Sequence, residues 1–370
     1  MSNPKWYELD DASEIITPSL LVFPDRIENN IREMIAMVAD VKLLRPHIKT
    51  HKTAEIIKMH MAHGIQKFKC ATIAEAELLA MCGAPDILLA MQPVGANIDR
   101  FFKLINTYPN CQFSALVDNS LIADAIGEKA KEHNNVVGLW MDINNGMNRT
   151  GIQPNGLAEA LYLKLANHAH IEVKGLHVYD GHLRNTDFES RKNDCDEAFE
   201  AVLELKNTID AHGIKIENII AGGSPSFPIH AKRQGVVASP GTVALWDAGY
   251  GRLFPEMKFV PAAVLITRII SKPARNILCL DLGHKSIAPE MPFPRVQFLG
   301  MEGVEQVGQS EEHLVLKCAN WDNYKVGDVC YAVPVHICPT VAKYESLQVV
   351  SERKISGTWK VAARNQKITV

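Results

Sequence analysis

The chain has 370 residues, of which 47% are hydrophobic and 22% are charged, and its formal net charge is −3 at pH 7. A chain of this length and composition can bury one large core together with a smaller one. The slightly negative charge provides no basic field, which argues against a nucleic-acid binder and favours small-molecule partners. No apolar run is long enough to span a membrane, and the first residues lack the apolar segment of a signal peptide. We therefore expect a cytoplasmic protein.

The eight cysteines are scattered along the chain without a Cys-x-x-Cys pair or a framework spacing. This distribution favours a reducing compartment and mostly buried free thiols. Cys338 is the exception, because it lies in a motif that suggests other chemistry.

Apolar spacing predicts a strand at residues 17–23 and a helix at 26–39. Strands then alternate with helices: strands are predicted at 43–49, 67–71, 87–91, 112–117, 136–143, 173–179 and 216–221, and helices at 54–63, 74–82, 98–107, 121–132, 156–166 and 191–212. This alternation indicates βαβ units with parallel strands. About eight such units, with no early Gly-x-Gly-x-x-Gly motif, favour an α/β fold with a (β/α)8 TIM barrel over residues 15–245.

From about residue 246 the pattern changes to apolar runs without long helices, at 259–266, 277–281, 313–316 and 329–333. We predict a second, mostly β domain formed by residues 246–370 together with residues 1–14. No long linker separates the two domains, so we expect them to share a packed interface.

Residues 43–52 join an apolar start to a dense run of ionisable side chains. If this run is extended, the two-residue period places four basic side chains on one face: Arg45, His47, Lys49 and His51. A partly desolvated lysine among cations loses its proton more readily and becomes an amine nucleophile that can form a Schiff base. We predict that Lys49 is this nucleophile. The alternative is a basic surface loop that binds an anion or nucleic acid.

Further candidates follow other predicted strands, where barrels of this kind carry their chemistry. Asp142, Asn144 and Arg149 surround the end of one strand. His177 and Tyr179 share a face of the next. A lone tyrosine near a strand end is more often a packed amphipathic side chain than a cofactor partner. The shared position of these residues at one rim nevertheless favours a functional site.

Two late glycine turns suggest a phosphate site. Gly222, Gly223 and Ser224 follow the last strand of the series, and residues 239–242 (Ser-Pro-Gly-Thr) follow a short apolar run. Backbone N–H groups and hydroxyls on such turns can bind phosphate, although Gly-Gly pairs are also ordinary turn residues. A nucleophilic lysine and a phosphate site at one rim are the pair that pyridoxal phosphate requires.

Four segments together resemble the D-threonine aldolase and D-serine dehydratase family, relatives of alanine racemase among the fold-type III pyridoxal phosphate enzymes: residues 45–52, 146–151, 222–224 and 336–340. The resemblance covers nearly the whole chain. It implies that Lys49 binds the cofactor covalently, that Arg149 faces its phenolic oxygen and that Tyr179 lies by its pyridine ring. It also implies that Gly223, Ser224, Gly241 and Thr242 lie around the phosphate. We add the strand-end residue His177 and the turn residue Gly222 to the predicted cofactor-binding residues.

A metal motif lies near the C-terminus. His336 and Cys338 are an i, i+2 pair, which one extended segment would direct toward the same ion. Imidazole and thiolate suit Zn²⁺, although an isolated His-x-Cys is far more often unliganded. The resemblance implies a divalent metal here, most simply Zn²⁺ with Mn²⁺ and Mg²⁺ as alternatives, that holds the β-hydroxyl of the substrate in an open coordination shell.

The expected function is a cytoplasmic pyridoxal phosphate lyase acting on D-configured 3-hydroxy amino acids. Aldol cleavage would give glycine and an aldehyde, and dehydration would give a 2-oxo acid and ammonia; the cysteine at the second metal position favours dehydration. The alternatives are an amino-acid racemase, which needs no metal, and a non-catalytic cofactor-binding barrel. The resemblance also implies a homodimer in which the β domain of one subunit closes the barrel of the other, an arrangement that would shield a cofactor carbanion from water.

Overall fold

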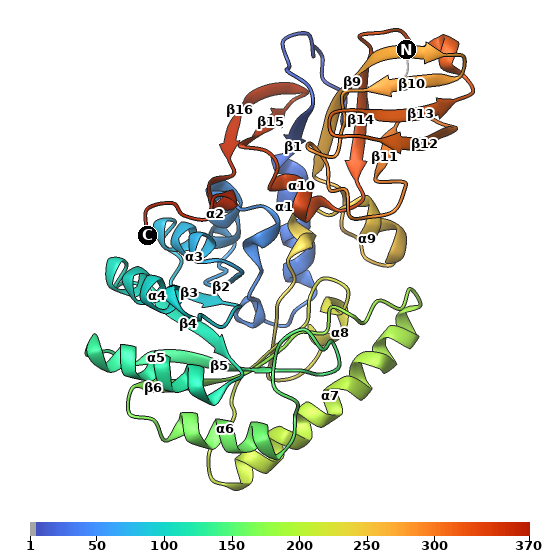
Figure 1. Ribbon diagram of the computed structural model, residues 1–370. Helices are drawn as coiled ribbons and strands as arrows, with labels where there is room; N and C mark the ends of the chain where they lie inside the picture. The colour runs from blue at the N-terminus through green and yellow to red at the C-terminus, as the bar shows by residue number, and fades with distance from the viewer. Residues whose placement is uncertain (1–4) are drawn as a thin grey trace. The chain divides into compact units, whose positions relative to one another are not determined.

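The computed structural model describes residues 5–370, which form two compact units (Figure 1). The barrel unit consists of Met34–Lys49, Ile57–Gly241 and Asn365–Val370. The β unit consists of the described residues up to Glu33, Thr50–Ile56 and Thr242–Arg364. The chain passes between the units several times, twice within a helix, in α1 (Pro24–Ala36) and α2 (Ala54–Ala62).

The barrel unit contains seven parallel strands in sequential order: β2 (Lys67–Cys70), β3 (Asp86–Leu89), β4 (Gln112–Val117), β5 (Val137–Ile143), β6 (Ile171–Val178), β7 (Ile219–Ala221) and β8 (Val236–Ala238). Its helices are α3 (Ile73–Met81), α4 (Ala96–Thr107), α5 (Ser120–Glu132), α6 (Gly156–Ala166), α7 (Phe188–Ala211) and the short α8 (Phe227–His230). Figure 1 shows α4, α5 and α6 on the outer side of the strands. Buried side chains on these strands form a hydrophobic cluster that includes Leu88, Leu116, Trp140, Ile220 and Val237.

An extended segment, Leu44–His47, closes this sheet into a barrel. Leu44 forms a parallel bridge with Ala238 of β8, and His47 forms one with Lys69 of β2. The proline at position 46 favours an extended residue before it and donates no hydrogen bond. The segment thus acts as the eighth strand, and the predicted TIM-type barrel is confirmed.

The prediction that residues 43–49 form one regular strand is wrong. A 3-10 turn, η1 (Val41–Leu43), precedes the extended segment, and a second one, η2 (Ile48–Thr50), follows it. Lys49 therefore lies in a turn rather than on a strand face. Its backbone N–H donates to Nδ1 of His47 at 3.2 Å, a local bond that an extended chain could not make.

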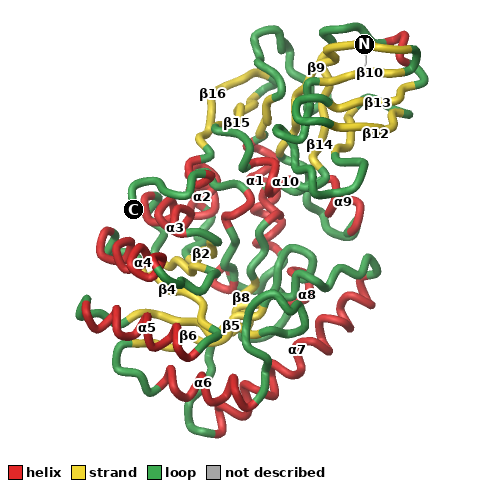
Figure 2. The backbone as a smooth tube through the Cα atoms, in the orientation of Figure 1, coloured by secondary structure: helices red, strands yellow, loops and turns green. Residues whose placement is uncertain are grey.

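The β unit is built on a nine-stranded sheet (Figure 2). Its strands are β1 (Ser19–Val22), β9 (Ala263–Ala274), β10 (Ile277–Leu280), β11 (Val296–Leu299), β12 (Val304–Gln309), β13 (Leu314–Cys318), β14 (Val329–Pro334), β15 (Ser346–Ser351) and β16 (Lys354–Lys360). Two short helices, α9 (Ala248–Leu253) and α10 (Ile337–Val341), and the 3-10 turns η3 (Thr242–Ala244), η4 (Trp321–Asn323) and η5 (Ala362–Arg364) complete it. A core that includes Tyr7, Leu21, Val264, Tyr331 and Val350 holds the sheet together.

The first predicted strand does form, but in the other unit. β1 pairs antiparallel with β9 and parallel with β15, so its assignment as the first barrel strand is wrong. The predicted barrel range of 15–245 thus contains a strand of the β sheet. Apolar residues 20–23 are buried in either arrangement, and their pattern does not specify the partner strand.

No helix within residues 5–370 is both long enough and apolar enough to cross a bilayer. All eight cysteines are free thiols, and four of them are buried: Cys70, Cys195, Cys318 and Cys330. The expectation of free thiols is therefore confirmed.

Candidate active site

Three basic side chains of the barrel unit surround the ring of Tyr179, which follows β6. The Nζ atoms of Lys49 and Lys69 lie 5.7 Å and 5.9 Å from the ring centroid, and Cζ of Arg149 lies 4.7 Å from it. At such distances a cation is attracted by the electrons of the ring. The structure therefore brings together three predicted residues, Lys49, Arg149 and Tyr179, and adds Lys69, which the sequence analysis missed.

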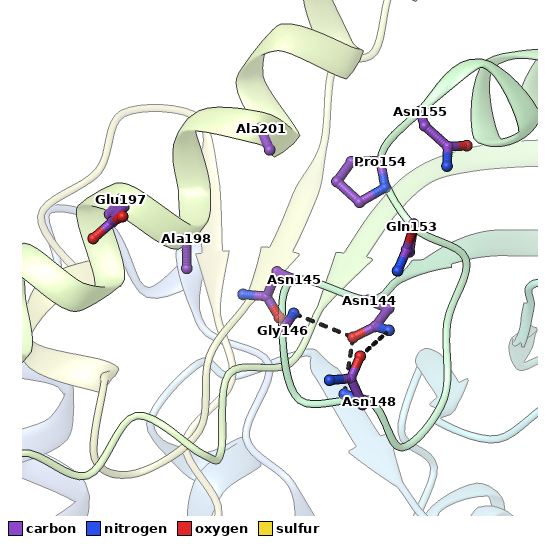
Figure 3. Close-up of a pocket in the computed structure, with 10 residues that line it drawn as sticks. All are labelled: Asn144, Asn145, Gly146, Asn148, Gln153, Pro154, Asn155, Glu197, Ala198 and Ala201. Carbon is purple, nitrogen blue, oxygen red and sulfur yellow. Dashed lines mark hydrogen bonds between the residues drawn. The ribbon is translucent and has the colours of Figure 1, made fainter.

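Arg149 is positioned by an asparagine turn that follows β5. Asn144 Oδ1 accepts the backbone N–H groups of Gly146 at 3.2 Å and Asn148 at 3.0 Å (Figure 3). Asn148 has φ +54°, a left-handed conformation that asparagine tolerates better than most residues. A cavity of about 370 Å³ borders this turn and is lined on its other side by Glu197, Ala198 and Ala201 of α7. Lys49 and Tyr179 do not line it, so we assign it no part in the site.

Lys69 contacts a buried histidine, which in turn contacts a buried carboxylate. Nδ1 of His177 lies 2.7 Å from Oδ1 of Asp142, and Nε2 of His177 lies 3.5 Å from Nζ of Lys69. Because a carboxylate accepts at Nδ1, that nitrogen carries the hydrogen and Nε2 is free to accept from the lysine. Burial, helped by the charges of Lys69 and Arg149, lowers the pKa of His177 against the opposing effect of Asp142. The imidazole is therefore neutral near pH 7.

The structure corrects the predicted cationic face. Arg45 is buried, but its guanidinium binds both carboxylate oxygens of Asp86, at 2.7 Å and 2.8 Å, so its charge is balanced. The proton of Lys69 is destabilised, since burial and then the charge of Lys49 lower the pKa of Lys69 to about 7. Residues 67–70 (Lys-Phe-Lys-Cys) show a strand with a lysine on every second position, a signal that could have identified Lys69.

The first glycine turn packs directly against Tyr179. A Cβ on Gly223 would lie 2.9 Å from Cε2 of Tyr179, so only glycine fits. Gly222 has φ +80°, and a Cβ there would lie 2.7 Å from Cδ2 of His230. The second turn joins the first, because the N–H of Gly241 donates to Oγ of Ser224 at 3.2 Å. The two turns therefore lie together, with Gly223 beside the aromatic ring.

A buried hydrogen-bonded network supports this turn. Asp180 accepts from Oγ of Ser226 and from Nε2 of His230, both at 2.6 Å, and Ser226 in turn accepts the N–H of Gly223 at 3.2 Å. Although burial opposes it, His230 and these hydrogen bonds lower the pKa of Asp180. Burial raises the pKa of the Cys195 thiol to about 12.

Within residues 5–370, Asp180, Cys195 and His230 are the group of three possible metal-ligand side chains whose ligand atoms lie within 4.8 Å of one another. They are bonded to each other, because Sγ of Cys195 lies 3.8 Å from Asp180 and His230 donates to the same carboxylate. We therefore interpret them as a structural support of the glycine turn. The sequence analysis did not identify them, since their segments are separated in the chain.

The predicted metal pair lies in the β unit. His336 is the N-terminal cap of α10, with φ −134°, and Cys338 lies in the first turn of that helix, so the predicted extended segment is wrong. Pro339 fits the first turn, where its missing N–H leaves no helical bond unmade. The side chains of His336 and Cys338 nevertheless interact closely enough to shift the pKa of both groups. The helix start therefore brings the two donors together.

Glu290 orients this pair. Its Oε1 lies 2.5 Å from Nδ1 of His336. Nε2 is therefore the imidazole nitrogen that remains available to act together with Cys338. Sγ of Cys338 lies 3.1 Å from Oγ1 of Thr50 and 3.6 Å from Oγ1 of Thr242. Although burial opposes both shifts, the interaction between the two side chains raises the pKa of His336 to about 9 and lowers that of Cys338. Imidazole and thiolate, oriented by a carboxylate, are a donor set that suits Zn²⁺.

Two of these residues are joined in sequence to the barrel set. Thr50 directly follows Lys49, and Thr242 directly follows Gly241. The predicted site residues thus fall into a barrel group and a β-unit group, with Thr242 in the second.

A parallel barrel that carries a lysine, an arginine and a glycine turn around one tyrosine has the architecture of a cofactor-dependent α/β barrel enzyme. Comparison with known protein families identifies the family to which the chain belongs. The chain belongs to the family described as "Alanine racemase, N-terminal domain", whose model matches residues 22–246. Residues 262–350 match a second model, described as "Putative serine dehydratase domain".

The curated relatives extend over nearly the whole chain. A 3-hydroxy-D-aspartate aldolase of Paracoccus denitrificans (strain Pd 1222) is 27% identical over 369 residues, which cover 96% of this chain and 94% of the relative. A D-threonine aldolase of an Arthrobacter species is 26% identical, with the same coverage. The crystal structure of D-threonine aldolase from Filomicrobium marinum has a TM-score of 0.88 at 24% identity and covers 95% of each chain. The predicted family and the predicted fold are confirmed.

Proposed function

We propose that this protein is a pyridoxal phosphate-dependent lyase that acts on D-configured 3-hydroxy amino acids. The observation that supports it best is the meeting of Lys49 and Arg149 around Tyr179, beside a turn in which only glycine fits. These residues follow different strands, and no local sequence feature requires them to meet. Relatives matched over nearly their whole length, which include a hydroxyaspartate aldolase, a threonine aldolase, a hydroxyaspartate dehydratase and a D-serine dehydratase, support the reaction class.

The donor groups of the barrel fit the proposed cofactor. Lys49 supplies the amine for covalent attachment, and Arg149 supplies a permanent cation for the phenolic oxygen. Gly223, Ser224 and Gly241, with Thr242, supply backbone and hydroxyl groups for the phosphate, with Gly222 and His177 adjoining them. When bound, pyridoxal phosphate supplies an electron sink for the breaking of a bond at the substrate Cα.

Reductive trapping tests the covalent assignment. Borohydride treatment of the purified protein should fix the cofactor to Lys49, as identified by peptide mass mapping, and Lys49→Ala should abolish this attachment. Lys69→Met is the matched control, because it removes the neighbouring lysine on the same tyrosine ring and should leave the label on Lys49. Label on Lys69 in the wild-type protein would refute the assignment.

We further propose that His336 and Cys338 bind a divalent metal, most simply Zn²⁺. Their interaction and the Glu290 contact at Nδ1 place two good donors side by side. A metal with so few protein ligands retains open positions and supplies a Lewis acid for the substrate hydroxyl.

Product analysis distinguishes the possible reactions. D-serine, D-threonine and 3-hydroxy-D-aspartate would each be incubated with the protein, with and without chelator. Glycine and an aldehyde identify aldol cleavage, whereas a 2-oxo acid and ammonia identify dehydration. The racemase alternative has less support, since the relatives matched over nearly their whole length are aldolases and dehydratases. Inversion of an amino acid that persists with chelator, without cleavage, would refute the lyase proposal.

Two further expectations stay proposals: a cytoplasmic location and a homodimer in which the β domain of one subunit closes the barrel of the other. Light scattering tests the dimer. A fully active monomer would contradict it.

A further inference from the structure

Lys69 is a buried amine that the proposed reaction leaves unused. Its side chain is 2% exposed and projects from β2, a strand next to the segment that leads to Lys49. Its hydrogen-bond partner is the neutral Nε2 of His177, at 3.5 Å, and it makes no ion pair with a carboxylate of the described residues. A buried ammonium without a counter-ion is unfavourable.

The charged and titratable groups that face Lys69 come from several elements: Lys49 of η2, Arg45 of the closing segment, Asp142 of β5, His177 of β6, Asp180 and the ring of Tyr179 after β6, and Arg149 beyond β5. The two acids among them already accept hydrogen bonds, Asp142 from His177 and Asp180 from Ser226 and His230. The cations Lys49 and Arg149 share the same tyrosine ring. The cluster therefore lacks an anion that a ligand could supply.

We propose that Lys69 is a positioning residue whose protonation is coupled to cofactor binding. Its side chain is a neutral amine while no anion is bound beside Tyr179, and it takes up one proton from solvent when the phosphorylated pyridine ligand binds there. This inference rests on the proposed function. The balance is simple, since R–NH₂ and H⁺ give R–NH₃⁺ and no other bond changes. His177 accepts one N–H of Lys69 in both states, so the side chain keeps its place while its charge changes.

The coupling predicts how affinity depends on pH. Burial and Lys49 lower the pKa of Lys69 to about 7 in the structure described, and an adjacent anion raises it. Below pH 7 the lysine is already charged, and binding requires no proton. Above pH 7 each binding event takes up a proton. The Kd of the wild-type protein therefore increases because of Lys69, by up to about tenfold per pH unit, until the pH reaches the pKa of Lys69 in the complex.

Pyridoxine 5′-phosphate is the probe, because it lacks the aldehyde and cannot react with Lys49. Its Kd is measured by calorimetry from pH 7 to 9 for the wild-type protein, Lys69→Met and Lys69→Arg. Lys67→Met is the matched control, since Lys67 lies two residues earlier on the same strand, where it lines a separate cavity with Arg45 and Asp86. The ionisations of the probe itself are common to all four proteins and cancel in Kd ratios.

The expected result is that Lys69→Met binds more weakly at pH 7 and that its Kd ratio to wild type falls by about tenfold per pH unit above pH 7. Lys69→Arg, permanently charged, should likewise lose the wild-type pH term, and Lys67→Met should retain it. A constant ratio of Lys69→Met to wild type across this range would overturn the inference while leaving the cofactor assignment intact. Failure of the wild-type protein to bind the probe at any pH would overturn both.

Discussion

Replacing Gly222 with alanine tests whether the glycine turn is as tightly supported as the structure indicates. Gly222 has φ +80°, and a Cβ there would lie 2.7 Å from Cδ2 of His230 and 2.9 Å from Oγ of Ser226. Gly213 is a matched control, because its φ is +82° and nothing lies within 4 Å of the added Cβ. The two substitutions therefore share the backbone strain and differ only in what the methyl group meets.

The left-handed conformation alone disfavours alanine by about 1–2 kcal/mol at either position. At Gly222, His230 must also move, which weakens its bond to the buried Asp180. Breaking a buried pair outright costs about 3–5 kcal/mol, so partial displacement should add about 2–4 kcal/mol. For a chain of 370 residues, this corresponds to a thermal midpoint lower by about 3–5 °C than that of Gly213→Ala.

Thermal unfolding of the cofactor-free protein, followed by circular dichroism, measures the difference. Gly222→Ala should also bind pyridoxine 5′-phosphate more weakly than wild type, whereas Gly213→Ala should bind it equally well. Equal thermal midpoints for the two variants would show that His230 and Ser226 can move away from the added methyl group without a loss in the free energy of unfolding. The inference that the Asp180 network supports the turn would then be wrong.

Three other predictions concern the metal pair and Lys69. Glu290→Gln should lower metal affinity about 10–100-fold in chelator competition because His336 loses its orienting carboxylate, whereas Glu311→Gln, a surface control in the same unit, should not. Cys338→Ser should remove bound metal and turnover but leave pyridoxine 5′-phosphate affinity unchanged; full turnover in this metal-free variant would refute the metal assignment. Because the pKa of Lys69 is lowered to about 7 in the folded protein, the unfolded chain binds one more proton than the folded protein between pH 7 and the ordinary pKa of a lysine. The free energy of unfolding should therefore rise with pH in this range, by up to about 1.4 kcal/mol per pH unit from this group. Urea unfolding of Lys69→Met should lack that rise.

Much of the fold is determined by local sequence pattern. The alternation of strands and helices from residue 54 onward matches β2 to β7 and α2 to α7 within a few residues. Helix starts agree because capping is local: Asn119 accepts the N–H of Leu121, and Asp187 accepts that of Ser190. The strands β11, β12, β15 and β16 were not predicted. β16 is mostly exposed, and exposed strands show little apolar periodicity.

The candidate site divides in the same way. The sequence by itself predicted that Lys49, Arg149 and Tyr179 share a site, because motif and strand-end position are visible in one dimension, and the structure places these side chains together. Only the tertiary structure showed that the proton of Lys69 is destabilised. Its pKa depends on burial and on the charges of Lys49 and other residues that reach it through strand pairing.

Tertiary structure also decided which sheet β1 joins and how His336 meets Cys338. Periodicity shows that one face of residues 19–22 is buried, but the partner strand is chosen by the total packing of the sheet, here with β9 and β15. The turn at Ile48–Thr50 and the helix after His336 likewise replace segments predicted to be extended. The sequence pattern indicates whether a residue is buried or exposed. The residues that surround it, and hence its charge state, are determined only when distant segments pack together.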